Sequence, residues 1–221
     1  MLILERLLPY EFTIIGVILV GCFLLARMKT REKLILFYVA TIFVFDVWAM
    51  SLAIEGKKNW FVYNILIGLE FLLLTVYLNM ILESKKLKNY LNVSCALYFV
   101  FSVIYVFLNG INTLMLPFSI VNGSILSFFF LLFLIYEQAE SKWINRPDNW
   151  FALGSIFYKV GTIPFLAMYL YLIDKKEELT TTLFLVINMG LSHLRFLLIL
   201  VGFLMIIKRK QNKPEISAVS I

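Results

Sequence analysis

The fold of this chain is decided by a long uncharged stretch, residues 89–136, which reads NYLNVSCALYFVFSVIYVFLNGINTLMLPFSIVNGSILSFFFLLFLIY. A bilayer core about 30 Å thick takes roughly 20 helical residues at ~1.5 Å each, so the stretch is too long for one crossing. Its middle, Asn109-Gly110-Ile111-Asn112, is rich in residues that adopt the positive φ of tight turns. It therefore predicts two membrane-spanning helices joined by a short external turn.

The flanking sequence contains further apolar runs, separated by short charged breaks. No break is long enough for a separate aqueous domain, which usually needs at least ~50 residues. The prediction is an all-α, polytopic membrane bundle in which residues 1–207 form a single transmembrane domain and residues 208–221 a short basic cytoplasmic tail. The seven expected spans run from Tyr10 to Ala26, Leu34 to Ile54, Asn59 to Leu82, Asn89 to Leu108, Thr113 to Tyr136, Asn149 to Ile173 and Thr180 to Ile207.

Composition agrees with this class of fold. The chain is 62% hydrophobic and only 15% charged, which a mainly water-facing surface does not accommodate. The formal net charge of +6 comes from short clusters between apolar runs, without the continuous basic face that phosphate tracking requires. A soluble fold and direct binding of nucleic acid are both disfavoured.

The distribution of Lys and Arg predicts the orientation, because cytoplasmic loops retain these residues during insertion. If the N-terminus lies outside, thirteen of them fall on the inner side and five on the outer side. The C-terminus is then cytoplasmic. The localisation expected from this pattern is the bacterial cytoplasmic (inner) membrane, as a multi-pass protein.

Four ionisable residues lie well inside the expected spans, and these are Asp46, Glu70, Lys159 and Arg195. Each charge at the bilayer centre costs at least ~2.5–3.5 kcal/mol on insertion scales, so we expect them to face the bundle interior. Their distances from the cytoplasmic boundaries place all four in one layer about 15–18 Å deep. As a working assignment, Glu70 pairs with Lys159 and Asp46 with Arg195.

Several polar side chains accompany these charges as candidate binding or ion-pathway residues. The candidates are Asn64, Asn122, Asn188, Ser192 and His193, the only histidine. The simpler interpretation is interhelical hydrogen bonding, and for His193 a packing role is favoured over a proton relay. A static ion-pair network is equally compatible with the four charges. A lone histidine does not make a metal site, and we expect no metal and no cofactor.

The sequence contains no H-E-x-x-H, G-x-S-x-G, P-loop or C-x-x-C motif, so no catalytic residue is assigned. A grouping of Cys95, His193 and Arg195 is formally available for an intramembrane enzyme, but residues scattered over two helices are weak evidence for catalysis. An enzyme is therefore the least favoured class.

Two local patterns carry a resemblance. The segment Asn64 to Phe71 reads N-x-x-x-x-x-E-F, and the sixth span opens with Asn-Trp-Phe. With its short loops, the chain resembles small bacterial seven-helix integral membrane proteins. By analogy, this resemblance implies a sensory or accessory role.

Three functions remain open from the sequence. The first is a non-enzymatic, receptor-like or regulatory membrane protein whose buried charges form a ligand or switch site. It would act through a protein partner or a homo-oligomer, because the loops are too short to signal chemically. The second is a channel or proton-coupled transporter that uses the same charged layer as its pathway. The third is an unrecognised intramembrane enzyme.

Overall fold

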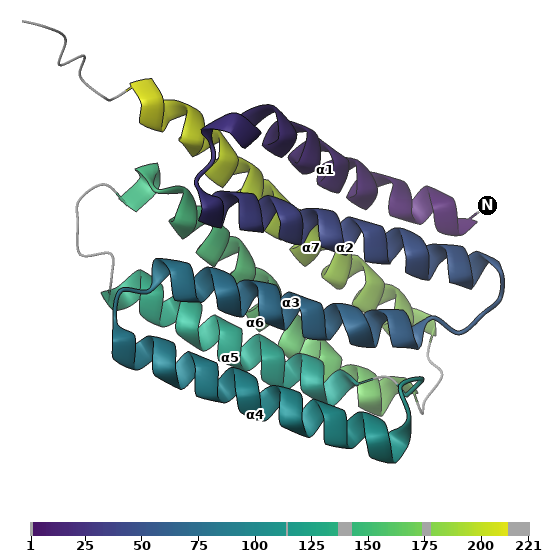
Figure 1. The fold of residues 1–221 in the computed structure, drawn as a ribbon. Coiled ribbons are helices and arrows are strands. Elements are labelled where there is room, and N and C mark those ends of the chain that lie inside the picture. The colour runs from purple at the N-terminus through teal and green to yellow at the C-terminus, as the bar shows by residue number, and fades with distance from the viewer. Residues whose placement is uncertain (1, 114, 137–142, 174–177, 212–221) are drawn as a thin grey trace, which may run out of the picture.

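The computed structural model describes residues 2–113, 115–136, 143–173 and 178–211, and these are helical apart from short connections. The elements are α1 (Leu2–Leu24), η1 (Leu25–Arg27), α2 (Thr30–Ile54), α3 (Trp60–Ile81), α4 (Lys85–Asn109), α5 (Leu116–Tyr136), η2 (Trp143–Asn145), α6 (Pro147–Ile173) and α7 (Glu178–Gln211). Figure 1 shows the helices side by side in one bundle, with α1 and α4 at opposite edges. No strand occurs in these ranges, so the all-α prediction is confirmed for them.

Six of the described helices are long and apolar enough to cross a membrane. They are α2, α3, α4, α5, residues Pro147–Ala167 of α6 and residues Val186–Lys208 of α7. This is consistent with a multi-pass membrane protein. The helix α1 does not belong to this set, although it packs against α2 and α7.

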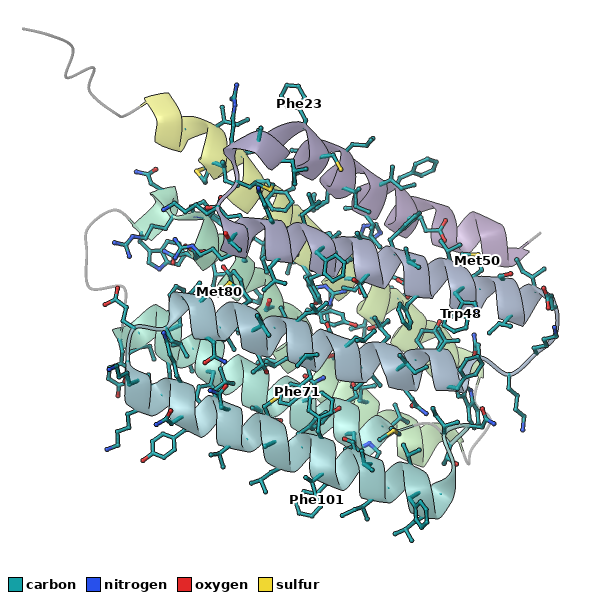
Figure 2. The ribbon with its side chains drawn as sticks, in the orientation of Figure 1. Phe23, Trp48, Met50, Phe71, Met80 and Phe101 are labelled. Atoms are coloured by element: carbon teal, nitrogen blue, oxygen red, sulfur yellow. The ribbon has the colours of Figure 1, made fainter. Side chains whose placement is uncertain are left out.

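The outer surface of the bundle is apolar, as lipid contact requires. Phe23 on α1 is 81% exposed and Phe101 on α4 is 59% exposed, whereas Phe71 on α3 is fully buried. Figure 2 shows Phe23 and Phe101 pointing away from the bundle at opposite edges, and Phe71 lying between α3 and α4. Exposed apolar surface of this extent is rare on soluble monomers and matches a bilayer environment.

Several helices begin or end beyond the predicted spans. The helix α2 starts at Thr30 instead of Leu34, because Oε2 of Glu32 accepts a hydrogen bond from the backbone N–H of Lys29 at 2.8 Å and caps the first turn. At the other end of the chain, α7 continues to Gln211, so residues 208–211 of the predicted tail are helical. The rest of that tail lies outside the described residues.

The predicted turn between the fourth and fifth spans is confirmed. The helix α4 ends at Asn109, and Gly110 follows with a φ of 81°, a conformation that glycine adopts without strain. The N–H of Gly110 still donates to the carbonyl of Val106 at 2.8 Å. The chain can therefore reverse direction at this point and enter α5.

Packing between helices leaves a seam through the bundle interior. The helix α6 packs mainly against α5 and α7, while α2 packs mainly against α3 and only slightly against α6. Long side chains from α2 and α3 meet those of α6 and α7 across the gap between these pairs. The candidate site lies in this seam.

Candidate functional site

One stripe of α3 carries a polar side chain at every second turn, of which Tyr63 is 37% exposed and the other two are buried. Tyr63, Glu70 and Tyr77 are spaced by seven residues, which places them on the same side of the helix, about 10.5 Å apart along its axis. Glu70 is 9% exposed and Tyr77 is fully buried. A buried carboxylate in the middle of an apolar helix requires partners from other helices.

Glu70 receives these partners from three helices. Its Oε2 lies 2.5 Å from Nζ of Lys159 on α6, and its Oε1 lies 3.1 Å from Nη1 of Arg195 on α7. The hydroxyl of Tyr38 on α2 donates to Oε1 at 2.7 Å and accepts a hydrogen bond from Nη1 of Arg195 at 3.0 Å. We call Tyr38, Glu70, Lys159 and Arg195 the Glu70 node, which joins α2, α3, α6 and α7.

Aromatic rings surround the two cations of the node. The guanidinium carbon of Arg195 lies 3.8 Å from the centroid of the Tyr158 ring and 4.6 Å from that of Phe196. Nζ of Lys159 lies 5.6 Å from the Tyr158 centroid. Because an aromatic face attracts a cation, the rings replace part of the hydration that burial removes.

The node is charged, buried and asymmetric. Lys159 is 5% exposed and Arg195 is 3% exposed, so one carboxylate faces two desolvated cations. Removing one partner of a buried ion pair usually costs ~3–5 kcal/mol, because the other charge stays uncompensated. Both buried cations therefore rely on the Glu70 carboxylate for charge neutralisation.

The geometry agrees with part of the pairing expected from the sequence. Glu70 does pair with Lys159, but Arg195 contacts Glu70 as well. The pairing of Asp46 with Arg195 remains a prediction. Asp46 lies two turns beyond Tyr38 on α2, about 12 Å along the axis, and interacts electrostatically with Tyr63 and Tyr158. It thus belongs to the same seam.

Asn64, a binding candidate from the sequence, lies one and a half turns before Glu70 and contacts the α4–α5 connection. Its Nδ2 donates to the carbonyls of Ile111 at 2.7 Å and Thr113 at 2.8 Å. Its Oδ1 accepts from the N–H of Met115 at 3.0 Å. These three bonds hold the turn against α3, which is a structural role.

The other polar candidates also bridge helices. Nδ2 of Asn122 on α5 donates to the carbonyl of Ile67 on α3 at 3.0 Å. Ser192 on α7 is buried and has a side-chain hydrogen bond with Tyr158, so it supports the ring beneath Arg195. Asn188 is half-buried one turn before Ser192. Ser192 thus contacts a residue that lines the node.

His193 lies at a different interface from the node. Its Nδ1 is 3.0 Å from Oγ1 of Thr13, which joins α7 to α1. The packing role favoured from the sequence remains a prediction. The sulfhydryl groups of Cys22 and Cys95 are both free, with Cys95 buried.

A second polar cluster, which the sequence analysis missed, lies at the end of the seam where α2 and α6 begin. Nη2 of Arg31 is 2.7 Å from Oδ2 of Asp148, and the hydroxyl of Tyr77 donates to Oδ1 of Asp148 at 2.9 Å. Arg31 and Asp148 were assigned to connecting loops, so they were not considered as partners. The available signal was Tyr77, since a buried tyrosine hydroxyl needs a partner and Tyr77 repeats the seven-residue spacing of Glu70.

Two apolar grooves border α4, the outermost helix on its side. One lies between α3 and α4 and includes Gly68, Phe99 and Ser102 in its walls, and the other lies between α4 and α5. Each has a volume of about 460 Å³. Neither groove is lined by a member of the Glu70 node. No group of three or more His, Cys, Asp or Glu side chains suited to a metal ion occurs in the described part of the chain.

Comparison with family models, with curated proteins and with solved structures finds no match to this chain.

Proposed function

We propose that this chain is a non-enzymatic, receptor-like or regulatory membrane protein, and that the Glu70 node is its switch. In this proposal all seven helices span the cytoplasmic membrane, with the N-terminus outside and the C-terminus inside. The excess of Lys and Arg at one end of the bundle supports the orientation. A protein partner or a second copy would read the change in helix arrangement.

The observation that carries the proposal is the sharing of one carboxylate by two cations on different helices. Glu70 on α3 contacts Lys159 on α6 and Arg195 on α7. An event that alters the charge or position of Glu70 changes both contacts together. Switches of this kind convert a local electrostatic change into a shift of whole helices.

A proton-coupled transporter is the second candidate, and the spacing of Tyr63, Glu70 and Tyr77 along one stripe favours it. These groups place three titratable side chains along one face about 10.5 Å apart, and a proton relay would need water or further side chains to connect them. Against it, the node side chains are closely paired and buried. The two functions make different predictions for flux.

The test combines distance measurement with flux. Spin labels at Lys33 on α2 and Lys208 on α7, both exposed, report the separation of these helix ends after Cys22 and Cys95 are replaced by serine. We expect Glu70→Gln to shift the distance by about 2 Å or more, the scale of known helix shifts, while the control Glu83→Gln does not. Proton flux into liposomes that is present in the unsubstituted protein and lost in Glu70→Gln would instead favour the transporter. An unchanged distance without flux would contradict both.

Reporter fusions test the topology separately. Alkaline phosphatase inserted at the α4–α5 turn after Gly110 is expected to be active, and a fluorescent protein fused to the C-terminus is expected to be fluorescent. The reverse pattern would contradict the proposed orientation.

A further inference from the structure

The corner between α1 and α2 presents a one-sided charge. Residues 25–33 read LARMKTREK, and Arg27, Lys29 and Lys33 are exposed. The acid in this segment, Glu32, is fully buried, with its Oε2 bound to the backbone N–H of Lys29 at 2.8 Å. The exposed face of the corner is therefore purely cationic.

Arg31, the fourth base of the corner, already forms an ion pair. Nη2 of Arg31 lies 2.7 Å from Oδ2 of Asp148, and that aspartate is buried. None of Arg27, Lys29 and Lys33 forms an ion pair with a carboxylate in the described part of the chain. All three cations are exposed and lie within six residues of one another in the sequence.

Two other basic groups in the described part of the chain differ from this corner. At the opposite end of the bundle, Lys57 is 2.7 Å from the carboxylate of Glu55. At the α3–α4 corner, Lys85 and Lys86 follow the exposed acid Glu83. These groups provide comparisons within the same protein.

Apolar side chains adjoin the cations. Phe23 is 81% exposed and Leu25 is 45% exposed, immediately before Arg27. In a phospholipid the charged headgroup phosphate lies beside apolar acyl chains, which matches a corner where cations lie beside apolar side chains. Basic residues at a membrane boundary also attract anionic lipid. We propose that the α1–α2 corner binds the headgroup of an anionic phospholipid, with Phe23 and Leu25 against its acyl chains.

The first experiment measures lipid retention by native mass spectrometry, with phosphatidylglycerol compared with phosphatidylcholine. Each base contributes at most about fivefold to the affinity for an anionic headgroup. The affinity of the triple variant R27Q/K29Q/K33Q for phosphatidylglycerol is therefore expected to fall by about tenfold to a hundredfold. The charge-matched control K85Q/K86Q/K88Q is expected to lose less than about threefold. Equal losses in the two triples, or equal retention of the two lipids, would overturn the proposal.

A second measurement needs no substitution and stays informative if the triple variant does not fold. Amine acetylation of the natural protein in nanodiscs is followed at Lys29 and Lys33, with Lys85 and Lys86 as internal references. Phosphatidylglycerol is expected to slow acetylation of the first pair several-fold more than that of the second. Equal slowing at both pairs contradicts the proposal. Equal protection by inorganic phosphate in phosphatidylcholine discs would identify a free anion as the ligand and would also overturn it.

Discussion

The ammonium group of Lys159 lies 2.5 Å from one carboxylate oxygen of Glu70, while Arg195 holds the other oxygen at 3.1 Å. The two cations come from neighbouring helices that already pack against each other. The acid comes from α3, across the seam. The three side chains are therefore unequal, because removing Glu70 leaves two buried cations without their carboxylate, whereas removing Lys159 leaves Glu70 paired with Arg195.

This inequality predicts an order of stabilities. Glu70→Gln leaves two buried cations beside a neutral amide and is expected to cost about 3–5 kcal/mol. Lys159→Met leaves Glu70 in contact with Arg195 and Tyr38, so its cost is expected to be smaller. Thermal unfolding in detergent measures both.

The double variant and a surface control complete this test. Glu70→Gln with Lys159→Met removes one of the two stranded cations and is expected to be more stable than Glu70→Gln alone. Glu83→Gln, at an exposed acid, is expected to stay within about 0.5 kcal/mol of the unsubstituted protein. If Lys159→Met costs more than Glu70→Gln, the node does not centre on Glu70.

The second polar cluster gives a prediction for Tyr77. Its hydroxyl donates to the carboxylate of Asp148 at 2.9 Å, and hydrogen bonds to charged groups are worth about 1.5–3 kcal/mol. We expect Tyr77→Phe to cost that amount in the same unfolding assay, and less in an Asp148→Asn background. Tyr90→Phe, at a tyrosine that is 55% exposed, serves as the control. Additive losses from Tyr77→Phe and Asp148→Asn would show that the bond contributes nothing.

Asn64 predicts the local stability of the α4–α5 turn. Asn64→Ala removes the bonds to Ile111, Thr113 and Met115, and we expect amide hydrogen exchange at Thr113 and Met115 to accelerate at least about tenfold. Asn109→Ala is the matched control, because Nδ2 of Asn109 bonds only the carbonyl of Tyr105 within its own helix among the described contacts. Similar exchange in both variants would mean that Asn64 does not hold the turn.

Two glycines predict opposite responses to a methyl group. A Cβ at Gly154 on α6 would lie 3.0 Å from the carbonyl oxygen of Arg195 on α7, whereas a Cβ at Gly190 would meet nothing within 4 Å. Gly154→Ala is expected to cost about 1–3 kcal/mol through helix displacement. Gly190→Ala is expected to be neutral or to stabilise by up to about 1 kcal/mol. Equal effects would argue against close α6–α7 packing.

The sequence predicted the long helices from their length, and it predicted one layer for Glu70, Lys159 and Arg195 from their depth. The pairing of Glu70 with Lys159 was a working assignment that depth did not decide. The rise per residue gives the depth of a side chain in the membrane, and opposite charges at similar depths can form ion pairs. Height carries no information about which helices are neighbours. For that reason the contact of Arg195 with Glu70 was not anticipated.

Other contacts of the site could not be predicted, because the sequence does not show where a long side chain points. Tyr38 was not considered, because a tyrosine in an apolar span does not reveal where its hydroxyl points. Asn64 was a binding candidate, but the backbone carbonyls that it contacts belong to a turn 47 and 49 residues away in the chain. Such contacts depend on the completed packing of the helices.

The sequence separation within the Glu70 node has a consequence for biogenesis. Lys159 follows Glu70 by 89 residues and Arg195 follows it by 125. At ~5–20 residues per second, roughly 6–25 seconds pass between the synthesis of Glu70 and that of Arg195. The third helix therefore leaves the ribosome before either cation exists, and its acid must be shielded by the insertion machinery or held near the water interface. Final docking of α3 in the bundle becomes a late step, completed only when the last helix arrives.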